Sequence, residues 1–218
     1  MFEYKLEKSI RRTISVTVLY NGNIVVRAPL YMSEIEIDAF VNKKAVWIER
    51  KINEAKQKAA HVPVLKDGET LCFCGKNYVL KISGDVKRVK ISDEFLILPA
   101  ENTVLLFRNF VKREFEPYIK QKTLYYAKLF GFEVNKISVG SATKRWGSCS
   151  SSKKIIFNFR LALIPECAID YVVIHELCHT QQLNHGKGFY SLLSHCMPYY
   201  KENEAVLSEY GAVCSCLI

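Results

Sequence analysis

The stretch His175–His179 reads His-Glu-Leu-Cys-His, and a further histidine, His185, follows six residues later. On a helix, residues four apart lie one above the other on the same face, so both imidazoles of this stretch can reach one metal ion. Glu176 lies beside them, where a carboxylate can take a proton from a metal-activated water. A third nitrogen from His185 leaves one tetrahedral position open, as a catalytic zinc site requires. The spacing therefore predicts a zinc-dependent hydrolase that binds one Zn²⁺ per chain.

The sequence around this stretch favours a buried helix. Pro165 suits the first turn of a helix, and Glu166 adds an acid near the positive end of the helix dipole. Apolar residues then form a broad surface that would bury the helix and hold its ligands rigidly. After the helix, Asn184 and Gly186 predict a left-handed turn that brings His185 back towards the pair.

A second motif precedes this helix. Residues 141–150 combine hydroxyls, glycine, the cation Arg145 and the aromatic Trp146, and residues 154–161 have the composition of a strand. Such a strand beside a zinc-site helix can offer its edge to an extended peptide. Arg145 is suited to fix a substrate carboxylate or phosphate, or to stabilise a developing oxyanion. A surface cation stacked on a packing aromatic explains the Arg145–Trp146 pair equally well.

Several of these runs together resemble a known family, the YgjP-like metallopeptidase domain, which is distantly similar to the SprT-like and WLM zinc proteases. The resemblance covers nearly the whole chain and is densest from about Ser138 to Tyr200. It rests on Arg145–Cys149, Asn158–Leu161, Pro165, Asp170–Val173, His175–His179, Asn184–His185 and Phe189–Tyr190.

This resemblance implies that His175, His179 and His185 are zinc ligands and that Glu176 is the catalytic acid/base. It also implies an α+β fold in which a zincin-like catalytic half, with the His-Glu-x-x-His helix and a short mixed sheet, follows a strand-rich N-terminal half. Tyr190 stands where the family commonly has Trp. Arg145, Tyr190 or a backbone N–H remain alternative partners for the oxyanion, and Trp146 is a further candidate for binding substrate.

Two regions follow from the distribution of strands and helices. Residues 1–101 are predicted as a strand-rich region with a hairpin around Asn21–Asn23 and one basic helix that Ser33 opens. Residues 102–218 are predicted as the zincin-like metallohydrolase domain, beginning with a long helix from Thr103 to Phe130 that Gly131 caps. One continuous domain over the whole length of the family resemblance is the alternative.

Bulk properties restrict the function further. With 218 residues, 49% hydrophobic and 24% charged, the chain is an ordinary globular sequence without a membrane-length apolar run. Its cysteines sit mostly inside apolar patterns, as reduced core thiols do, and we expect a cytoplasmic protein without a membrane partner.

The net charge of +9 favours anionic partners, including nucleic acid, although the cations form scattered clusters typical of a solvated surface. Three function classes remain. A zinc metallopeptidase acting on peptides or unfolded protein is the first. A zinc-dependent hydrolase of nucleotide phosphoanhydrides is the second. A non-enzymatic basic nucleic-acid-binding module with a structural zinc is the third, and it gives no role to Glu176.

Overall fold

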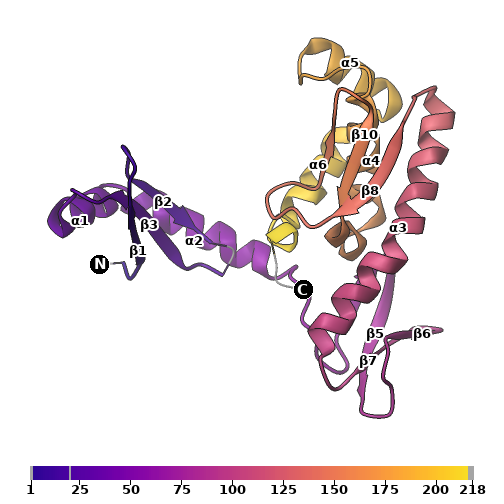
Figure 1. Ribbon diagram of the computed structural model, residues 1–218, viewed down its shortest axis with the longest axis horizontal. Coiled ribbons are helices and arrows are strands. Elements are labelled where there is room, and N and C mark those ends of the chain that lie inside the picture. Colours follow the sequence, from indigo (N-terminus) through magenta and orange to yellow (C-terminus); the bar gives the residue numbers. More distant parts are fainter. Residues whose placement is uncertain (1, 20, 216–218) are drawn as a thin grey trace. The chain divides into compact units, whose positions relative to one another are not determined.

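The computed structural model describes residues 2–19 and 21–215, apart from the side chains of Lys58 and Ser215. The chain forms two compact units, Met1–Val62 and Pro63–Ile218. The change from strand-rich to helical sequence near Asn102 therefore falls inside the second unit. Figure 1 shows the helices and strands of each unit, most of them labelled.

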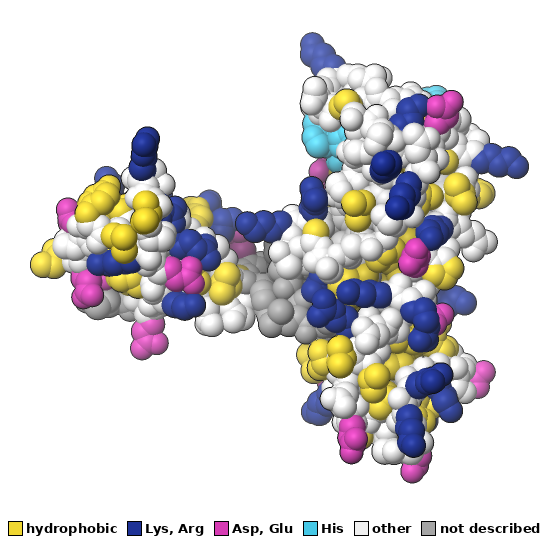
Figure 2. Space-filling view, viewed as in Figure 1, with side chains coloured by type: hydrophobic (Ala, Val, Ile, Leu, Met, Phe, Trp, Pro, Cys, Tyr) yellow, Lys and Arg dark blue, Asp and Glu magenta, His cyan; other side chains and the backbone are white. Residues whose placement is uncertain are grey.

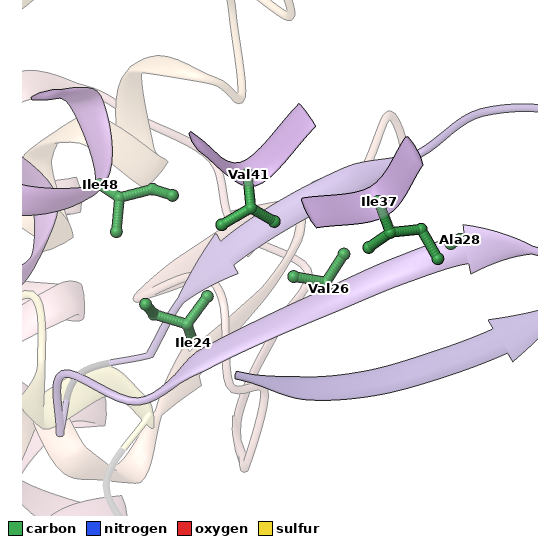
Figure 3. Packing of buried hydrophobic residues seen from close by; sticks show 6 residues of the cluster. All are labelled: Ile24, Val26, Ala28, Ile37, Val41 and Ile48. Atoms are coloured by element: carbon green, nitrogen blue, oxygen red, sulfur yellow. The ribbon is translucent and has the colours of Figure 1, made fainter. Parts of the chain in front are cut away.

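The first unit packs two helices on a three-stranded mixed sheet of order β1-β3-β2. β1 (Lys5–Ser9) runs parallel to β3 (Ile24–Pro29), and β2 (Ser15–Val18) pairs antiparallel with it. The hairpin predicted around Asn21–Asn23 is present, with Gly22 in the left-handed region at φ +83. Alternate residues of β3 point towards the helices. Figure 3 shows the resulting core, made by Ile24, Val26, Ala28, Ile37, Val41 and Ile48.

The basic helix expected from Ser33 onward is present as two helices, α1 (Glu34–Lys43) and α2 (Ala45–Ala59). Ser33 caps α1 in the predicted way, since its hydroxyl accepts from the backbone N–H of Glu36 and the Glu36 carboxylate accepts from the N–H of Ser33. The helices divide at Lys44, whose N–H donates to Val41 three residues back at 3.0 Å, a tighter turn than an α-helix makes.

The second unit begins with a mixed sheet of order β4-β5-β7-β6, made by β4 (Thr70–Phe73), β5 (Lys76–Ser83), β6 (Lys90–Ser92) and β7 (Phe95–Pro99). The long helix α3 (Thr103–Phe130) has the predicted bounds, and Gly131 ends it at φ +71. Its buried side chains, including Phe107 and Phe115, face this sheet and the elements that follow. Leu129, next to the end of this helix, is 56% exposed.

A third small mixed sheet, of order β8-β10-β9, carries the rest of the unit. β8 (Lys136–Gly140) is parallel to β10 (Lys154–Asn158), and β9 (Gly147–Cys149) is antiparallel to it at the sheet edge. The 3-10 helix η1 (Phe159–Leu163) connects β10 to α4 (Glu166–Cys178). The chain continues through α5 (Lys187–Cys196), α6 (Tyr200–Glu209) and the 3-10 helix η2 (Val213–Ser215).

Helix α4 is the centre of this part of the fold. It contacts α3, α5, α6 and β9, and all its side chains from Ala168 to Cys178 are buried except those of Asp170 and His175, which are half-buried. A helix that is apolar all round is stable only inside a packed structure, which explains why its hydrophobic residues show little sidedness. No helix in the described part of the chain is long and apolar enough to span a membrane.

Candidate metal centre

The last turn of α4 carries the predicted site residues. Pro165 is the N-cap of this helix rather than its first residue, and Glu166 supplies the acid in the first turn. His175 and Glu176 lie in the last turn, and His179 is the C-cap residue. Because the helix is packed on all sides, its backbone is held rigidly, and so are the positions from which these side chains extend.

The connection from α4 to α5 returns the chain to the end of α4. It is tightened by hydrogen bonds from Gln182 N–H to the Cys178 carbonyl, 2.9 Å, and from Gly186 N–H to the Asn184 carbonyl, 2.8 Å. The left-handed turn predicted here is absent, since Asn184 has no positive φ and Gly186 has φ −88. Hydrogen bonds back to the last turn of α4, rather than a left-handed residue, reverse the chain.

Three imidazole nitrogens converge at this place. The Nε2 atom of His185 lies 3.0 Å from Nε2 of His179 and 3.1 Å from Nε2 of His175. Zinc–nitrogen bonds of about 2.0–2.1 Å in tetrahedral geometry separate the nitrogens by about 3.3 Å, so the three atoms fit one zinc ion. His175, His179 and His185 form a group able to hold a metal ion. Figure 2 shows histidine side chains reaching the surface in the part of the molecule that contains α5.

Neighbouring groups orient the imidazoles. Nδ1 of His179 lies 2.9 Å from the Gln182 carbonyl, so Nδ1 donates and Nε2 keeps its lone pair for a metal. Phe189, the third residue of α5, is fully buried, and its ring centroid lies 4.6–4.9 Å from those of all three imidazoles. This ring fills the space behind the histidines and restricts their rotation.

Burial favours the neutral form of two of the imidazoles, those of His175 and His179. Burial lowers the pKa of His175 to about 4, with smaller contributions from the neighbouring His179 and His185. The pKa of His179 is also lowered, chiefly by burial. Neutral imidazole is the form that binds a metal ion.

Glu176 lies beside the three histidines and is 5% exposed. Burial raises the pKa of its carboxyl to about 7, and the charge of Arg145 opposes that rise. Within residues 2–19 and 21–215, Oε2 of Glu176 and Nδ1 of His175 are buried polar atoms without a hydrogen-bond partner. Buried polar groups in folded proteins are nearly always paired, so an unpaired carboxylate oxygen is typical of a site that receives water or a ligand.

Gly147, in β9, makes room for this carboxylate. A Cβ atom built on Gly147 would lie 2.6 Å from Oε1 and 2.7 Å from Cγ of Glu176, far inside van der Waals contact. Only glycine therefore permits β9 to lie this close to α4 with Glu176 in its present position. The glycine within the run Arg145–Cys149 was visible in the sequence, but its contact with Glu176 depends on the packing of β9 against α4.

The three residues predicted to bind substrate differ in how far their side chains are exposed to solvent. Arg145 is exposed in the connection between β8 and β9, and Trp146 is half-buried beside it. Both line a pocket of about 150 Å³ together with Ser141 and Asn158. Tyr190 is 44% exposed, and its ring centroid lies 6.4 Å from that of His185. Phe189, Gly147 and Gln182 are neighbours of the site to which sequence reasoning assigned no role.

A single metal centre with a buried carboxylate beside it is the arrangement that metal-dependent hydrolases use. A family model described as "YgjP-like, metallopeptidase domain" matches residues 12–210. The chain therefore belongs to the YgjP-like metallopeptidase family, which confirms the resemblance seen in the sequence. The family name indicates a metallopeptidase-like hydrolase and implies a bound metal, typically zinc. A search of curated proteins and a search of solved structures gave no match.

Proposed function

We propose that this protein is a zinc metallopeptidase in which His175, His179 and His185 hold the metal and Glu176 acts as general base. The observation that carries the proposal is the convergence of three imidazoles next to a buried carboxylate, with Nε2 of His185 lying 3.0 Å and 3.1 Å from the Nε2 atoms of His179 and His175. Three protein ligands leave one tetrahedral position for water or substrate, whereas a structural zinc site is closed by four.

The residues around the metal have separable tasks. A zinc ion bound by the three imidazoles supplies Lewis-acid chemistry, lowering the pKa of water to about 7 and polarising a carbonyl. Glu176 accepts the proton of the attacking water and delivers it to the leaving amine. The guanidinium of Arg145, whose charge acts on the Glu176 carboxyl, would attract the negative charge that develops on the carbonyl oxygen.

The position of β9 favours a peptide substrate. The N–H of Asn158 donates to the Trp146 carbonyl at 2.7 Å, so Trp146 and Asn158 form a hydrogen-bonded pair. Because such pairs alternate along antiparallel strands, Gly147 and Cys149 direct their backbone groups away from β10, towards the edge of the sheet. An extended peptide that pairs with this edge would pass directly beside Glu176.

The other two function classes are less well supported. Hydrolysis of nucleotide phosphoanhydrides is favoured by the exposed Arg145 and the basic surface, since guanidinium groups bind phosphate well. Figure 2, however, shows Lys and Arg spread over the visible face rather than gathered at the histidines. A nucleic-acid-binding module with structural zinc leaves the buried carboxylate of Glu176 unexplained.

The test compares the wild type with Glu176→Gln and, as a matched control, the exposed Glu202→Gln in α6. We expect zinc-loaded wild type and Glu202→Gln to cleave unfolded protein, and Glu176→Gln to keep zinc while losing at least about 100-fold in rate. Full activity of Glu176→Gln would contradict the role of this carboxylate. Release of phosphate from nucleotides without peptide cleavage would select the phosphoanhydride reaction instead.

The cellular compartment in which the protein acts is a separate part of the proposal. The thiols of Cys72, Cys149 and the buried Cys178 are free. Free thiols persist in reducing compartments, which supports the cytoplasm as the place of action.

A further inference from the structure

The segment Ser141–Trp146, which we call the 141–146 loop, connects β8 to β9 without helix or strand structure. It carries Lys144 and Arg145, both exposed, and leads directly into Gly147. In the described part of the chain, every hydrogen bond made by this loop comes from one residue, Asn158.

Asn158 holds the loop at three points. Its side-chain Nδ2 donates to the carbonyl of Ala142 at 2.6 Å and to the carbonyl of Arg145 at 3.2 Å. Its backbone N–H donates to the Trp146 carbonyl at 2.7 Å. A third contact of Nδ2, 3.3 Å long, reaches Sγ of Cys214. Two carbonyls of the loop, those of Ala142 and Arg145, thus accept hydrogen bonds from the same side chain.

The orientation of the Asn158 amide is fixed from the other side. Its Oδ1 accepts from the N–H of Arg160 at 3.1 Å and caps η1, and the residue is only 2% exposed. Turning the amide over would place its oxygen against two carbonyl oxygens and its NH₂ against an N–H donor. The amide therefore has one favourable orientation, in which its donors point at the loop.

The loop in turn borders the candidate site. Gly147 contacts the Glu176 side chain, and the charge of Arg145 acts on the same carboxyl. We propose that Asn158 is a positioning residue, which holds the 141–146 loop so that Arg145 and Gly147 face Glu176. Its effect on catalysis rests on the proposed function, whereas its effect on the loop does not.

The sharpest variant is Asn158→Asp. A carboxylate of the same shape keeps the acceptor for the N–H of Arg160 but loses both donors to the loop. Asn158→Ala is the uncharged second variant, because a buried carboxylate can destabilise the fold by itself. The matched control is Asn135→Asp, which removes the donor of a 2.9 Å hydrogen bond to the Ser152 carbonyl in a different connection.

The first readout is limited trypsin digestion below the unfolding temperature, because Lys144 and Arg145 are themselves trypsin sites. Cleavage after these residues should become about tenfold faster in both Asn158 variants and stay unchanged in Asn135→Asp, with zinc content preserved. In the wild type, cleavage there should be slower than after Lys66, an exposed residue in another connection. The proposal would be overturned if folded Asn158 variants were cleaved at the loop at the wild-type rate. It would also be overturned if the wild type were cleaved at the loop before it is cleaved after Lys66.

The second readout is peptide hydrolysis. In both Asn158 variants kcat/KM should fall with zinc still bound, while Asn135→Asp stays at the wild-type value. Normal kcat/KM together with faster loop cleavage would overturn the link to catalysis. If the wild type itself cleaves no peptide, the proposed function fails, and the trypsin arm still decides whether Asn158 holds the loop.

Discussion

At the level of single residues, the most restrictive contact is the one between Gly147 and Glu176. The backbone of β9 approaches the carboxylate so closely that a methyl group has no space, with a Cβ-to-Oε1 separation of 2.6 Å. On this side, Glu176 therefore packs against the backbone of Gly147 rather than against a side chain. A buried carboxyl is thereby kept next to the open edge of β9, where a peptide substrate would pass.

Gly147→Ala should therefore disturb the site without touching a metal ligand. The new methyl group forces Glu176 to move, and we expect at least about a tenfold loss of hydrolysis, since a misplaced catalytic group loses much of its effect. Zinc content should stay unchanged. Gly84→Ala is the control, because a Cβ atom there meets nothing within 4 Å. Hydrolysis at the wild-type rate by Gly147→Ala would contradict the steric restriction of Glu176 at this position.

At the level of elements, α4 and α5 hold the site together through Phe189. This ring packs against the two imidazoles at the end of α4 and the one in the connection that follows, as its centroid distances of 4.6–4.9 Å show. The site is thus supported from behind by α5, although α5 contributes no ligand of its own. Groups that orient metal ligands from behind commonly affect metal affinity as well as stability.

Phe189→Leu should weaken zinc binding by about 10- to 100-fold, because the imidazoles lose the surface that restricts them. Phe107→Leu, at an equally buried position on α3, should lower the unfolding temperature without changing zinc affinity. Competition with a fluorescent zinc chelator measures the zinc affinity of both variants. Equal zinc affinities in the two variants would argue that Phe189 contributes only to packing.

The N-terminus of α1 provides a pH-dependent test in the first unit. The backbone N–H and hydroxyl of Ser33 bond the Glu36 carboxylate and lower its pKa from 4.5. A carboxyl with a lowered folded-state pKa stabilises the fold above its unfolded-state pKa, and that stability is lost as the pH falls through the folded-state value. The stability difference between wild type and Glu36→Ala should be full at about pH 6 and shrink towards about pH 3.

Thermal unfolding across this range measures the effect. Glu34→Ala is the matched control, since it removes a first-turn acid that lies outside the capping box. A difference between wild type and Glu36→Ala that stays constant down to about pH 3 would contradict the contribution of the ionised carboxylate.

At the level of the whole molecule, local patterns and distant contacts were predictable to different extents. The helix start at Ser33, the hairpin at Gly22 and the long helix ending at Gly131 follow from local sequence, and all three were predicted. The division of the first helix at Lys44 was not. The histidine spacing likewise placed His175, His179 and His185 together. Their approach depends on α4 and the connection after it, which are adjacent in the sequence.

Features that depend on distant packing were missed. No local pattern shows that Gly147 contacts Glu176 or that Asn158 holds the 141–146 loop. The first contact requires β9 to pack against α4, and the second requires β9 and β10 to pair. Cys74, for instance, lies in the β4–β5 turn with φ +49. The hydrogen bond from its N–H to the Ala162 carbonyl, 2.7 Å, comes from a segment far along the chain.

The central claim is that the three histidines form one zinc site whose carboxylate neighbour is not a ligand. The most direct measurement is the metal content of the untagged protein, by mass spectrometry, beside His179→Ala and Glu176→Gln. We predict about one zinc per chain in the wild type and in Glu176→Gln, and almost none in His179→Ala. A wild type that binds no zinc when the metal is supplied, or His179→Ala with undiminished zinc, would contradict the account.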